Sequence, residues 1–489
     1  MSNTHTSVGD TYAQGPPADL QVLLSRNGPL EWPEDLFPYQ ATGTQALLAN
    51  DCLLLADDMG LGKTVQAIAA LRVLVLANPQ IAALVVAPVG LIVQWRRAIH
   101  HWAPELKVST VVGPPSDRAL KWRAPAHVHL VGYETLRADY TENPQSPPRR
   151  RVWDVVILDE AQKIKNRDTE VSQTTKRLPR RRVWALTGTP LENRVDDLAS
   201  ICEFLTPWEE GQRIRTLYPG QELYDRHRQL QLRRKKRDVL PQLPEKTVAE
   251  VMVELGPRQR ETYDDAEKRG IRHIRELGTT ATITHVLELI QRLKQICNFC
   301  SVSGASAKLD DVRNRLVTLV AEGHRALVFT QYTDPSFGVA ALDEKLAAFN
   351  PLTYSGRLST AMRDRVVSRF KTQDEHKILI LSLRAGGQGL NLQEASYVFH
   401  FDRWWNPAVE HQAEDRSHRL GQQYPVTVYK YLCENTIEER IDTILRQKQA
   451  LFDEHVDDVS IDLARGLTSE ELFGLIGLPA PPAAARSGR

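Results

Sequence analysis

The stretch LLLADDMGLGKTVQAIAAL, residues 53–71, places an apolar run before a glycine-rich turn and a helix-forming segment after it. Gly60 and Gly62 would let backbone N–H groups approach phosphate oxygens, and the following helix would direct the positive end of its dipole towards them. Lys63 would then contact the β- and γ-phosphates of a nucleotide, and Thr64 would coordinate magnesium. The stretch therefore predicts a phosphate-binding loop between a strand and a helix. Its alternative is a glycine-rich turn that binds nothing.

A second motif, VVILDEAQ at residues 155–162, supports the phosphate loop. Its apolar run predicts a strand that ends in Asp159 and Glu160, and carboxylates at that edge of a parallel sheet lie beside the phosphate loop. Asp159 suits magnesium, and Glu160 suits the positioning and deprotonation of an attacking water. An acidic pair after a strand can also be a simple helix cap. The phosphate loop favours the catalytic interpretation, although Asp57 stands where the generic loop pattern begins with glycine.

The runs around these motifs predict an α/β fold. Short β-branched runs alternate with helical segments from about 37 to 205 and again from about 308 to 432, which is typical of parallel sheets flanked by helices. The charged segment between them has apolar residues at helical spacing, as in ITHVLELIQRLKQIC. We expect this middle segment to form helical insertions, with no sheet of its own.

Changes of composition divide the chain further. Thr436 with Glu439, and Thr468 with Glu471, predict capping boxes at two helices that follow the second lobe. Both ends of the chain are polar or Ala/Pro-rich and lack periodicity. The predicted organisation is a flexible N-terminal segment (1–30), a first lobe (31–205), helical insertions with an interlobe linker (206–306), a second lobe (307–435), brace helices (436–478) and a disordered tail (479–489).

Composition restricts the class of protein. The 489 residues, 42% hydrophobic and 25% charged, have a globular profile. The longest apolar run, IAALVVAPVGLIV, is interrupted by Pro88 and is too short for a membrane span, so we expect a cytoplasmic location and no membrane partner. The CxxC of Cys297 and Cys300 lacks a second ligand pair, which argues against zinc. A net charge of +1 leaves only local runs, such as RRKKR at 233–237, to contact a polyanion.

Together these motifs resemble those of the Swi/Snf-type ATPases of helicase superfamily two, over about residues 37–455. YQATGTQALL resembles the Q motif that reads adenine, and DDMGLGKT resembles motif I, including its non-glycine first position. The resemblance implies magnesium ligands at Thr64 and Asp159. It also implies nucleotide-binding roles for Gln40, Asp58, Met59, Gly60, Leu61, Gly62, Lys63 and Thr64.

Further motifs of the family follow along the chain. VVAPVGLIVQW resembles motif Ia, VGYETLR another strand-tracking motif, and DEAQKIKN motif II, with Gln162 in place of the commoner histidine, as in prokaryotic members. ALTGTPLENRVDDL resembles motif III, in which Thr187, Gly188 and Thr189 would connect the γ-phosphate to nucleic-acid contacts. LRRKKRDVLPQLPEK resembles the signature between the lobes, LSLRAGGQGLNL motif V, and QAEDRSHRLGQ motif VI. DRWWNPAVEHQ is particularly specific to this family.

Motif VI explains the need for a second lobe. Gln412, Arg416 and Arg419 have the spacing QxxxRxxR, which on one helix places all three side chains on one face. Phosphoryl transfer spreads negative charge over the γ-phosphate, and an arginine there is worth about three to five decades of rate. We predict catalytic roles for these three residues beside Lys63 and Glu160, in a site that is complete only when the lobes close. The alternative is a surface helix with salt bridges.

The resemblance implies two RecA-like P-loop NTPase lobes with helical insertions between them, and ATP and Mg²⁺ as cofactors. It implies a DNA-dependent ATPase that moves along double-stranded DNA and remodels or displaces DNA-bound proteins, with contacts mainly to phosphates. We expect a monomeric motor, nucleoid-associated in a prokaryote, that a protein partner directs to its target. The RRKKR run would contact phosphate or act as a hinge. Trp404 and Trp405 would pack between the lobes or stack on bases.

Two other functions stay open. A strand-separating helicase for RNA or single-stranded DNA shares motifs I, II and VI, but the signature between the lobes and DRWWNP argue against it. An ATP-gated scaffold subunit of a DNA repair or defence complex would tolerate a damaged hydrolytic set, whereas Lys63, Asp159, Glu160, Arg416 and Arg419 are all present. The motifs do not identify the remodelled target, the pathway or the direction of movement.

Overall fold

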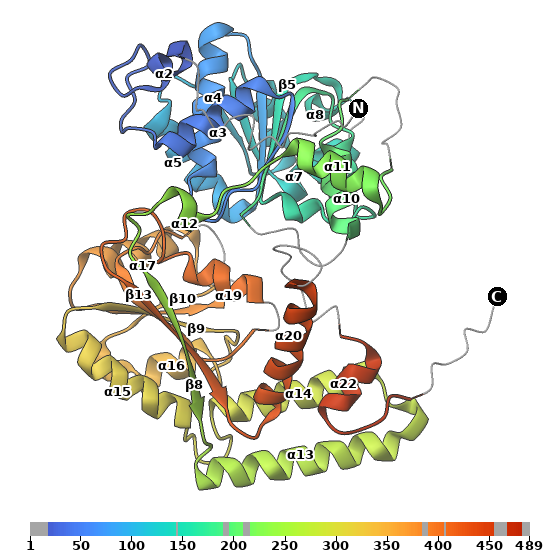
Figure 1. Ribbon diagram of the computed structural model, residues 1–489, viewed down its shortest axis with the longest axis vertical. Helices are drawn as coiled ribbons and strands as arrows, with labels where there is room; N and C mark the ends of the chain where they lie inside the picture. Colours follow the sequence, from blue (N-terminus) through green and yellow to red (C-terminus); the bar gives the residue numbers. More distant parts are fainter. Residues whose placement is uncertain are drawn as a thin grey trace, which may run out of the picture. The chain divides into compact units, whose positions relative to one another are not determined.

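The computed structural model describes residues 18–142, 145–188, 195–208, 216–383, 390–404, 407–453 and 467–481. Contacts within the chain divide it into two compact units, unit 1 (Met1–Gln242) and unit 2 (Leu243–Arg489). Figure 1 shows the elements of unit 1 in blue to green and those of unit 2 in green to red. Each unit has its own sheet and its own buried core.

Unit 1 is built on a parallel sheet of seven strands in the order β3-β4-β2-β5-β6-β1-β7. The strands are β1 Cys52–Leu55, β2 Ala83–Ala87, β3 Val108–Val111, β4 Val128–Gly132, β5 Trp153–Asp159, β6 Arg180–Leu186 and β7 Gln231–Leu232. The helices are α2 Ala18–Leu24, α3 Pro38–Ala49, α4 Lys63–Ala77, α5 Ile92–Trp102, α6 Pro115–Arg123, α7 Tyr133–Glu142, α8 Pro147–Arg150, α9 Glu170–Lys176, α10 Val195–Phe204, α11 Gln221–Leu230 and α12 Lys236–Val239.

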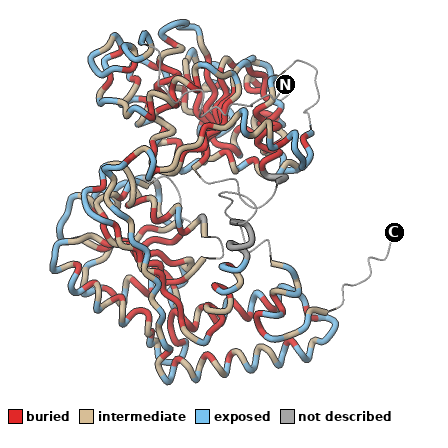
Figure 2. Tube along the Cα trace, in the orientation of Figure 1, coloured by how far each residue is buried: buried red, intermediate tan, exposed pale blue. Residues whose placement is uncertain are grey.

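Both faces of this sheet are buried. Leu53 and Leu55 of β1 belong to one core cluster, and Leu54 between them belongs to another, because successive side chains of a strand point to opposite faces. Helices α4 and α5 contribute to the first cluster, and α6, α7 and α10 contribute to the second. Figure 2 colours these strands mostly as buried. Strands covered on both faces read as continuous apolar runs, which is why the sequence predicted them.

Unit 2 has a parallel sheet of six strands in the order β10-β11-β9-β12-β13-β8. The strands are β8 Lys246–Val253, β9 Arg325–Thr330, β10 Leu352–Tyr354, β11 Ile378–Ser382, β12 Ala395–His400 and β13 Val426–Cys433. The helices are α13 Pro257–Leu277, α14 Ile283–Asn298, α15 Ala307–Ala321, α16 Val339–Lys345, α17 Thr360–Thr372, α19 Pro407–Glu414, α20 Ile437–Asp453 and α22 Ser469–Leu475. The predicted class of two parallel α/β lobes is confirmed.

The middle segment, predicted as helical insertions over 206–306, is mainly helical where it is described and forms no third sheet there. It nevertheless adds a strand to each existing sheet: β7 pairs with β1 in unit 1, and β8 pairs with β13 in unit 2. The division between the units falls after Gln242, well beyond the predicted end of the first lobe at 205. The sequence missed both strands because β7 has two residues and β8 is half exposed, so neither gives a continuous apolar run.

The N-terminal segment differs from the prediction in part. Helix α2 lies in the segment predicted to be flexible, and Leu24 and Leu30 are buried in a cluster with Trp32. These few apolar residues over a short helix give too weak a periodic signal to predict. Most of the predicted tail, 479–489, lies outside the described residues.

Helices α13, α14, α20 and α22 share one core cluster of unit 2. Thr468 and Glu471 form the predicted capping box of α22, each side chain accepting the backbone N–H of the other residue. At α20 the cap is displaced, because Glu439 accepts from the backbone N–H of Asn435 and not from Thr436. Among the described residues, no helix combines the length and the apolar character needed to cross a membrane.

Candidate nucleotide site

The phosphate loop follows β1, as the sequence predicted. Gly60 and Gly62 have φ angles of 86° and 72°, a left-handed conformation that residues with a Cβ atom rarely adopt. A Cβ atom at Gly62 would also lie 2.4 Å from Nε2 of Gln40. Helix α4 begins at Lys63 directly after Gly62. Because Gly62 is the N-cap and has no side chain, the first N–H groups of α4 can bind an anion.

The ammonium group of Lys63 lies against the loop. Its Nζ donates to the backbone carbonyl of Asp57 at 2.6 Å and to that of Asp58 at 3.1 Å. Burial lowers the pKa of Lys63 below its ordinary value, and the charges of Asp57, Glu160 and Asp159 oppose that shift. A phosphate group would provide a negative partner in direct contact with this ammonium group, which donates here to two neutral backbone carbonyls.

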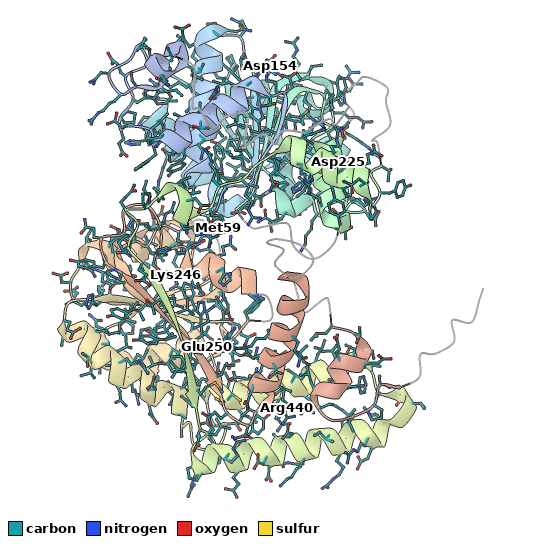
Figure 3. The ribbon with its side chains drawn as sticks, in the orientation of Figure 1. Met59, Asp154, Asp225, Lys246, Glu250 and Arg440 are labelled. Carbon is teal, nitrogen blue, oxygen red and sulfur yellow. The ribbon has the colours of Figure 1, made fainter. Side chains whose placement is uncertain are left out.

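Other predicted loop residues surround this ammonium group. A Cβ atom at Gly188 would lie 2.5 Å from Cγ of Met59 and 3.0 Å from Nζ of Lys63, so the chain after β6 packs against the loop. Met59 is labelled in Figure 3. Leu61 is fully buried, and Thr64 is half-buried in the first turn of α4. The role of Thr64 as a magnesium ligand stays a prediction.

Asp159 ends β5 and is held by two aromatic side chains. Its Oδ2 accepts from the indole Nε1 of Trp95 at 2.6 Å, and its backbone carbonyl accepts from the hydroxyl of Tyr133 at 2.8 Å. Burial, reinforced by the charge of Glu160, raises the pKa of Asp159 above its ordinary value, although Trp95 and Lys63 act in the other direction. The protein therefore leaves the negative charge of Asp159 incompletely balanced. Such a carboxylate fits a divalent cation.

Glu160 is connected to the end of β6 through Gln162. Nε2 of Gln162 donates to Oε2 of Glu160 at 2.6 Å, and the hydroxyl of Thr187 donates to Oε1 of Gln162 at 3.1 Å. Glu160 has a φ of 51°, which is uncommon outside glycine. The predicted base is thus fixed both by its backbone and by a neighbouring amide. Thr189, which the sequence grouped with Thr187, lies outside the described residues.

The sequence missed Trp95 and Tyr133 as parts of the site. Both lie in segments that resembled strand-tracking motifs, but no local pattern indicates that they contact Asp159, which follows them by dozens of residues in the chain. A donor opposite the carboxylate is needed because a buried carboxylate without hydrogen bonds is costly.

Gln40, predicted to read adenine, is buried in α3 beside the loop. Its Nε2 donates to the carbonyl of Leu61 at 3.4 Å, and its Oε1 accepts from the backbone N–H of Phe37 at 3.1 Å. These contacts tie α3 to the phosphate loop. Recognition of a base by Gln40 stays a prediction.

The three motif VI residues of unit 2 do not share one helix, and this prediction was wrong. Helix α19 contains Gln412 but ends at Glu414, so Arg416 and Arg419 lie in the turns that follow. The hydroxyl of Ser417 donates to the carbonyl of Glu414 at 3.0 Å, a local bond that competes with continued helix. The two arginines still influence each other: burial and the charge of Arg416 lower the pKa of Arg419 to about 10.

Helix α19 is fixed by a buried cluster of charges, which we term the anchor cluster. It consists of Glu410 and Glu414 with the basic side chains of Lys246, Arg403 and Lys430. Lys430 Nζ lies 2.8 Å from Glu414 and 3.3 Å from Glu410, and Lys246 Nζ lies 2.8 Å from Glu414. Arg403 and Lys430, with a contribution from His400, lower the pKa of Glu410 to about 2, despite its burial. Figure 3 labels Lys246 on β8.

The structure describes some of the aromatic and basic residues whose roles the sequence left undecided. Trp404 is partly buried against a core cluster of unit 2, and Trp405 lies outside the described residues. Packing between the lobes and stacking on bases both stay predictions. The glycine-rich part of motif V, residues 384–389, also lies outside them. Within RRKKR, the side chain of Arg234 turns inward to an ion pair with Asp57, and Arg237 is exposed.

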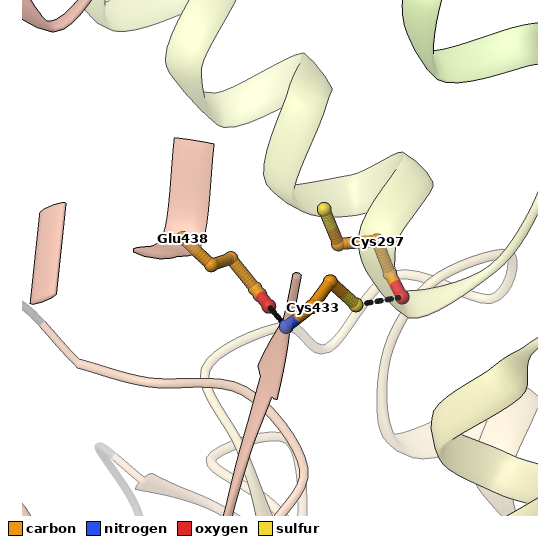
Figure 4. A group of neighbouring side chains, drawn as sticks. All are labelled: Cys297, Cys433 and Glu438. Atoms are coloured by element: carbon orange, nitrogen blue, oxygen red, sulfur yellow. Dashed lines mark hydrogen bonds between the residues drawn. The ribbon is translucent and has the colours of Figure 1, made fainter. Parts of the chain in front are cut away.

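A buried group of possible metal ligands occurs in unit 2, where Figure 4 shows Cys297, Cys433 and Glu438. Lys308 Nζ lies 2.7 Å from Oε1 of Glu438, and both side chains are fully buried. Glu438 also accepts the backbone N–H of Cys433 at 3.0 Å. Because Lys308 already neutralises the carboxylate and burial raises the pKa of the Cys433 thiol, the contacts are those of a packed core.

The fold and the site define a class of protein: a P-loop nucleotide-binding protein with two parallel α/β units. Two family models match the chain, the SNF2-related domain over residues 39–302 and the helicase conserved C-terminal domain over residues 307–421. The chain belongs to the SNF2 family, as its motifs predicted.

Curated relatives agree with this family. The chain is 36% identical over 478 residues to a Bacillus subtilis protein named "Putative ATP-dependent helicase/translocase YwqA", covering 91% of this chain and 51% of the relative. It is 32% identical to an uncharacterised ATP-dependent helicase of Mycoplasma pneumoniae, covering 86% of this chain and 42% of the relative. The chain therefore spans about half the length, or less, of these relatives.

More distant relatives include a mouse protein named as a SWI/SNF-related, matrix-associated, actin-dependent regulator of chromatin, subfamily A member 1, which is 29% identical and matches over 86% of this chain and 43% of its own length. Among solved structures, the Sulfolobus solfataricus SWI2/SNF2 ATPase core in complex with dsDNA aligns with 29% identity and a TM-score of 0.41. That alignment covers 92% of this chain and 98% of the archaeal one.

Proposed function

We propose that the protein is a DNA-dependent ATPase that moves along double-stranded DNA and remodels or displaces proteins bound to it. The observation that carries the proposal is the charge at the site of unit 1, in a chain of the SNF2 family. Lys63 is a half-buried cation with a lowered pKa, and Asp159 is a buried carboxylate with a raised pKa. Both shifts indicate groups that lack their full partners, which Mg²⁺ and nucleotide phosphates would supply.

The residues of unit 1 suit phosphoryl transfer to water. The N–H groups at the start of α4 and Lys63 would bind the phosphates. Asp159 and Thr64 would hold magnesium, which would supply positive charge to balance the phosphates. Glu160 accepts the proton of the attacking water, and Gln162 keeps its carboxylate oriented.

Unit 2 would contribute positive charge to the reaction. The negative charge that it stabilises builds up on the γ-phosphate only in the transition state. Arg416 and Arg419 lie close enough to lower the pKa of Arg419, so the pair favours an added anion. We propose that they stabilise the γ-phosphate in the transition state when the two units close on ATP. Closure and opening of the two units would then be coupled to different contacts of each unit with the DNA backbone.

The polymer is proposed from the family, whose curated relatives have names that include helicase, translocase and regulator of chromatin. Binding is expected to depend on phosphate contacts, and so to weaken with salt and to vary little with sequence. Magnesium and ATP are proposed as cofactors, and a protein partner is proposed to select the target. We also propose that the motor is monomeric and associated with the nucleoid of a prokaryotic cell.

The test is the steady-state ATPase rate at one salt concentration with no nucleic acid, duplex DNA, single-stranded DNA or RNA. Duplex DNA is expected to stimulate most, and Lys63→Ala is expected to abolish the stimulated rate. Arg269→Ala, on the exposed face of α13, is the control and should leave the rate unchanged. Stronger stimulation by RNA or single strands would replace the translocase with a strand-separating helicase. A low rate that no polymer changes would indicate an ATP-gated scaffold.

A further inference from the structure

A buried ion pair underlies the phosphate loop. Asp57, which occupies the position of the usual first glycine, is fully buried. Arg234 grips it with two nitrogens: Nε donates to Oδ1 at 2.9 Å, and Nη2 donates to Oδ2. Two parallel hydrogen bonds of this kind fix both the distance and the orientation of the two groups. The departure from the glycine pattern is therefore matched by a specific partner far along the chain.

Arg234 also contacts both helices beside the loop. Its Nη2 donates to Oε1 of Gln66 in α4 at 2.9 Å, and its Nη1 donates to the backbone carbonyl of Tyr39 in α3. Gln66 in turn donates to Oδ2 of Asp57 at 3.1 Å and to the carbonyl of Leu61 at 3.2 Å. The guanidinium group thus connects the helix that carries Gln40, the loop itself and the helix that receives the phosphates.

The packing leaves no space for a larger side chain at this junction. A Cβ atom at Gly43 of α3 would lie 1.8 Å from Oε1 of Gln66 and 2.7 Å from Nη2 of Arg234. Glycine in the middle of a helix costs about 0.5–1 kcal/mol relative to alanine. The close approach of Gln66 and Arg234 explains its presence in α3.

Backbone contacts dock the whole segment around Arg234, which we term the docking segment (232–236), along the loop. The N–H of Ala56 donates to the carbonyl of Leu232 at 2.8 Å, and the N–H of Asp58 donates to the carbonyl of Arg234 at 3.0 Å. The N–H of Lys236 then donates to the carboxylate of Asp58 at 2.9 Å. Leu55, at the end of β1, pairs with Leu232 of β7.

The docking segment lies close to the end of unit 1, so its movement would disturb the phosphate loop. It follows α11 (Gln221–Leu230) and lies a few residues before Gln242, where unit 1 ends. Any change that lifts this segment removes the ion-pair partner of Asp57 and leaves the carboxylate with the neutral amide of Gln66. The backbone carbonyl of Asp57 also accepts from Lys63. A buried carboxylate that loses its cationic partner is strongly unfavourable, so the loop would have to rearrange.

We propose that Arg234 is a positioning residue for the nucleotide, and that it couples nucleotide binding in unit 1 to docking of segment 232–236. This inference rests on the proposed function. A docked segment holds the loop in the shape that binds phosphates, and bound nucleotide, by reciprocity, stabilises the docked segment. The segment that leaves unit 1 therefore responds directly to the nucleotide.

The test compares Arg234→Lys with Arg237→Lys in the full chain. Lysine keeps the charge at 234 but loses the two-pronged contact, and Arg237 lies in the same basic run with a single exposed pair to Asp238 at 3.5 Å. The first readout is the Kd of a fluorescent ADP analogue without nucleic acid. Arg234→Lys is expected to raise the Kd by about tenfold or more. Arg237→Lys is expected to change it by less than about twofold.

A second readout separates coupling from a merely structural role. In the wild type, ADP is expected to slow hydrogen exchange of the amides of 232–236, and Arg234→Lys is expected to weaken that protection. Asp57→Asn should raise the Kd similarly, and the double variant should be little worse than either single one, because both changes break one pair. A Kd for Arg234→Lys within about twofold of the wild type, or exchange that ADP does not alter, would overturn the inference.

The two proposals fail in different ways. A wild type that binds no ADP would refute the nucleotide site and this inference together. A wild type that binds ADP with an affinity indifferent to Arg234 would refute only the inference. If Arg234→Lys does not fold, hydrogen exchange of the wild-type amides of 232–236 with and without ADP still tests the inference. Slower exchange with ADP supports the coupling, and unchanged exchange overturns it.

Discussion

Each unit places two acidic side chains close together, Asp159 with Glu160 and Glu410 with Glu414, and the two pairs differ in how their charge is balanced. In unit 1, burial and Glu160 raise the pKa of Asp159. In unit 2, Arg403 and Lys430 lower the pKa of Glu410 to about 2. Both pairs consist of carboxylates, but the charge of Asp159 is left incompletely balanced, whereas basic side chains neutralise the pair in unit 2. Incomplete compensation identifies the pair that awaits a ligand, whereas full compensation identifies the pair that holds a helix in place.

The largest expected effect tests whether unit 2 supplies the charge that the reaction lacks. Arg416→Ala is expected to reduce the DNA-stimulated rate of ATP hydrolysis by about three to five decades, because an arginine at the transferring phosphate is worth that much. ATP affinity should change little, since the contact forms mainly in the transition state. The measurement is single-turnover hydrolysis at saturating ATP. A rate reduced by less than about tenfold would show that Arg416 does not stabilise the transferring phosphate.

A substitution in the anchor cluster tests whether the acidic pair of unit 2 stabilises the fold. Glu410→Gln is expected to lower the free energy of unfolding by about 3–5 kcal/mol at pH 7, because it leaves buried cations with too little negative charge. Urea unfolding measures this difference. Glu250→Gln, which breaks a half-exposed pair with Arg446, is the control and should cost less than about 1 kcal/mol.

The contribution of Glu410 to the free energy of unfolding has a defined dependence on pH. A lowered pKa means that Glu410 stabilises the folded state above its ordinary pKa and that this contribution is lost as the pH falls towards about 2. The stability difference between wild type and Glu410→Gln should therefore shrink as the pH falls below about 4.5. A difference that stays constant over this range would mean that Glu410 acts through packing and not through charge.

A smaller effect is expected from the amide that orients Glu160. Gln162→Ala removes the donor to Glu160 and the acceptor of Thr187, so kcat is expected to fall by about tenfold while KM for ATP stays nearly constant. Gln173→Ala, which removes an amide bonded to the carbonyl of Arg167 in the same unit, is the matched control. Equal effects of the two substitutions would show that Gln162 has only a structural role.

The smallest expected effect has the opposite sign from that of Glu410. Asp159→Asn is expected to stabilise the protein without ligands by about 1 kcal/mol, because it removes an incompletely balanced buried charge. Since the pKa of Asp159 is raised, this gain is full at high pH and shrinks as the folded wild type takes up a proton. Thermal unfolding between pH 6 and 8.5, without nucleotide or metal, measures it. Destabilisation by Asp159→Asn would mean that the charge is already balanced.

The sequence predicted those parts of the molecule that local patterns encode. Strands buried on both faces read as apolar runs, and Gly60, Gly62 and Lys63 occupy the predicted loop. Contacts between distant segments were not predictable: no local pattern pairs Asp57 with Arg234 or Asp159 with Trp95. The end of α19 was missed because side-chain bonds to Glu414 override a helical spacing that continues through Arg419.

The most direct test of the account is the hydrolysis rate of Glu160→Gln with saturating duplex DNA, measured together with its affinity for ATP. Glutamine keeps the size of the side chain but cannot accept the proton of the attacking water. We expect ATP to bind Glu160→Gln with nearly unchanged affinity and hydrolysis to slow by about two to four decades. Hydrolysis within about tenfold of the wild-type rate would contradict the assignment of the uncompensated acidic pair as the catalytic site.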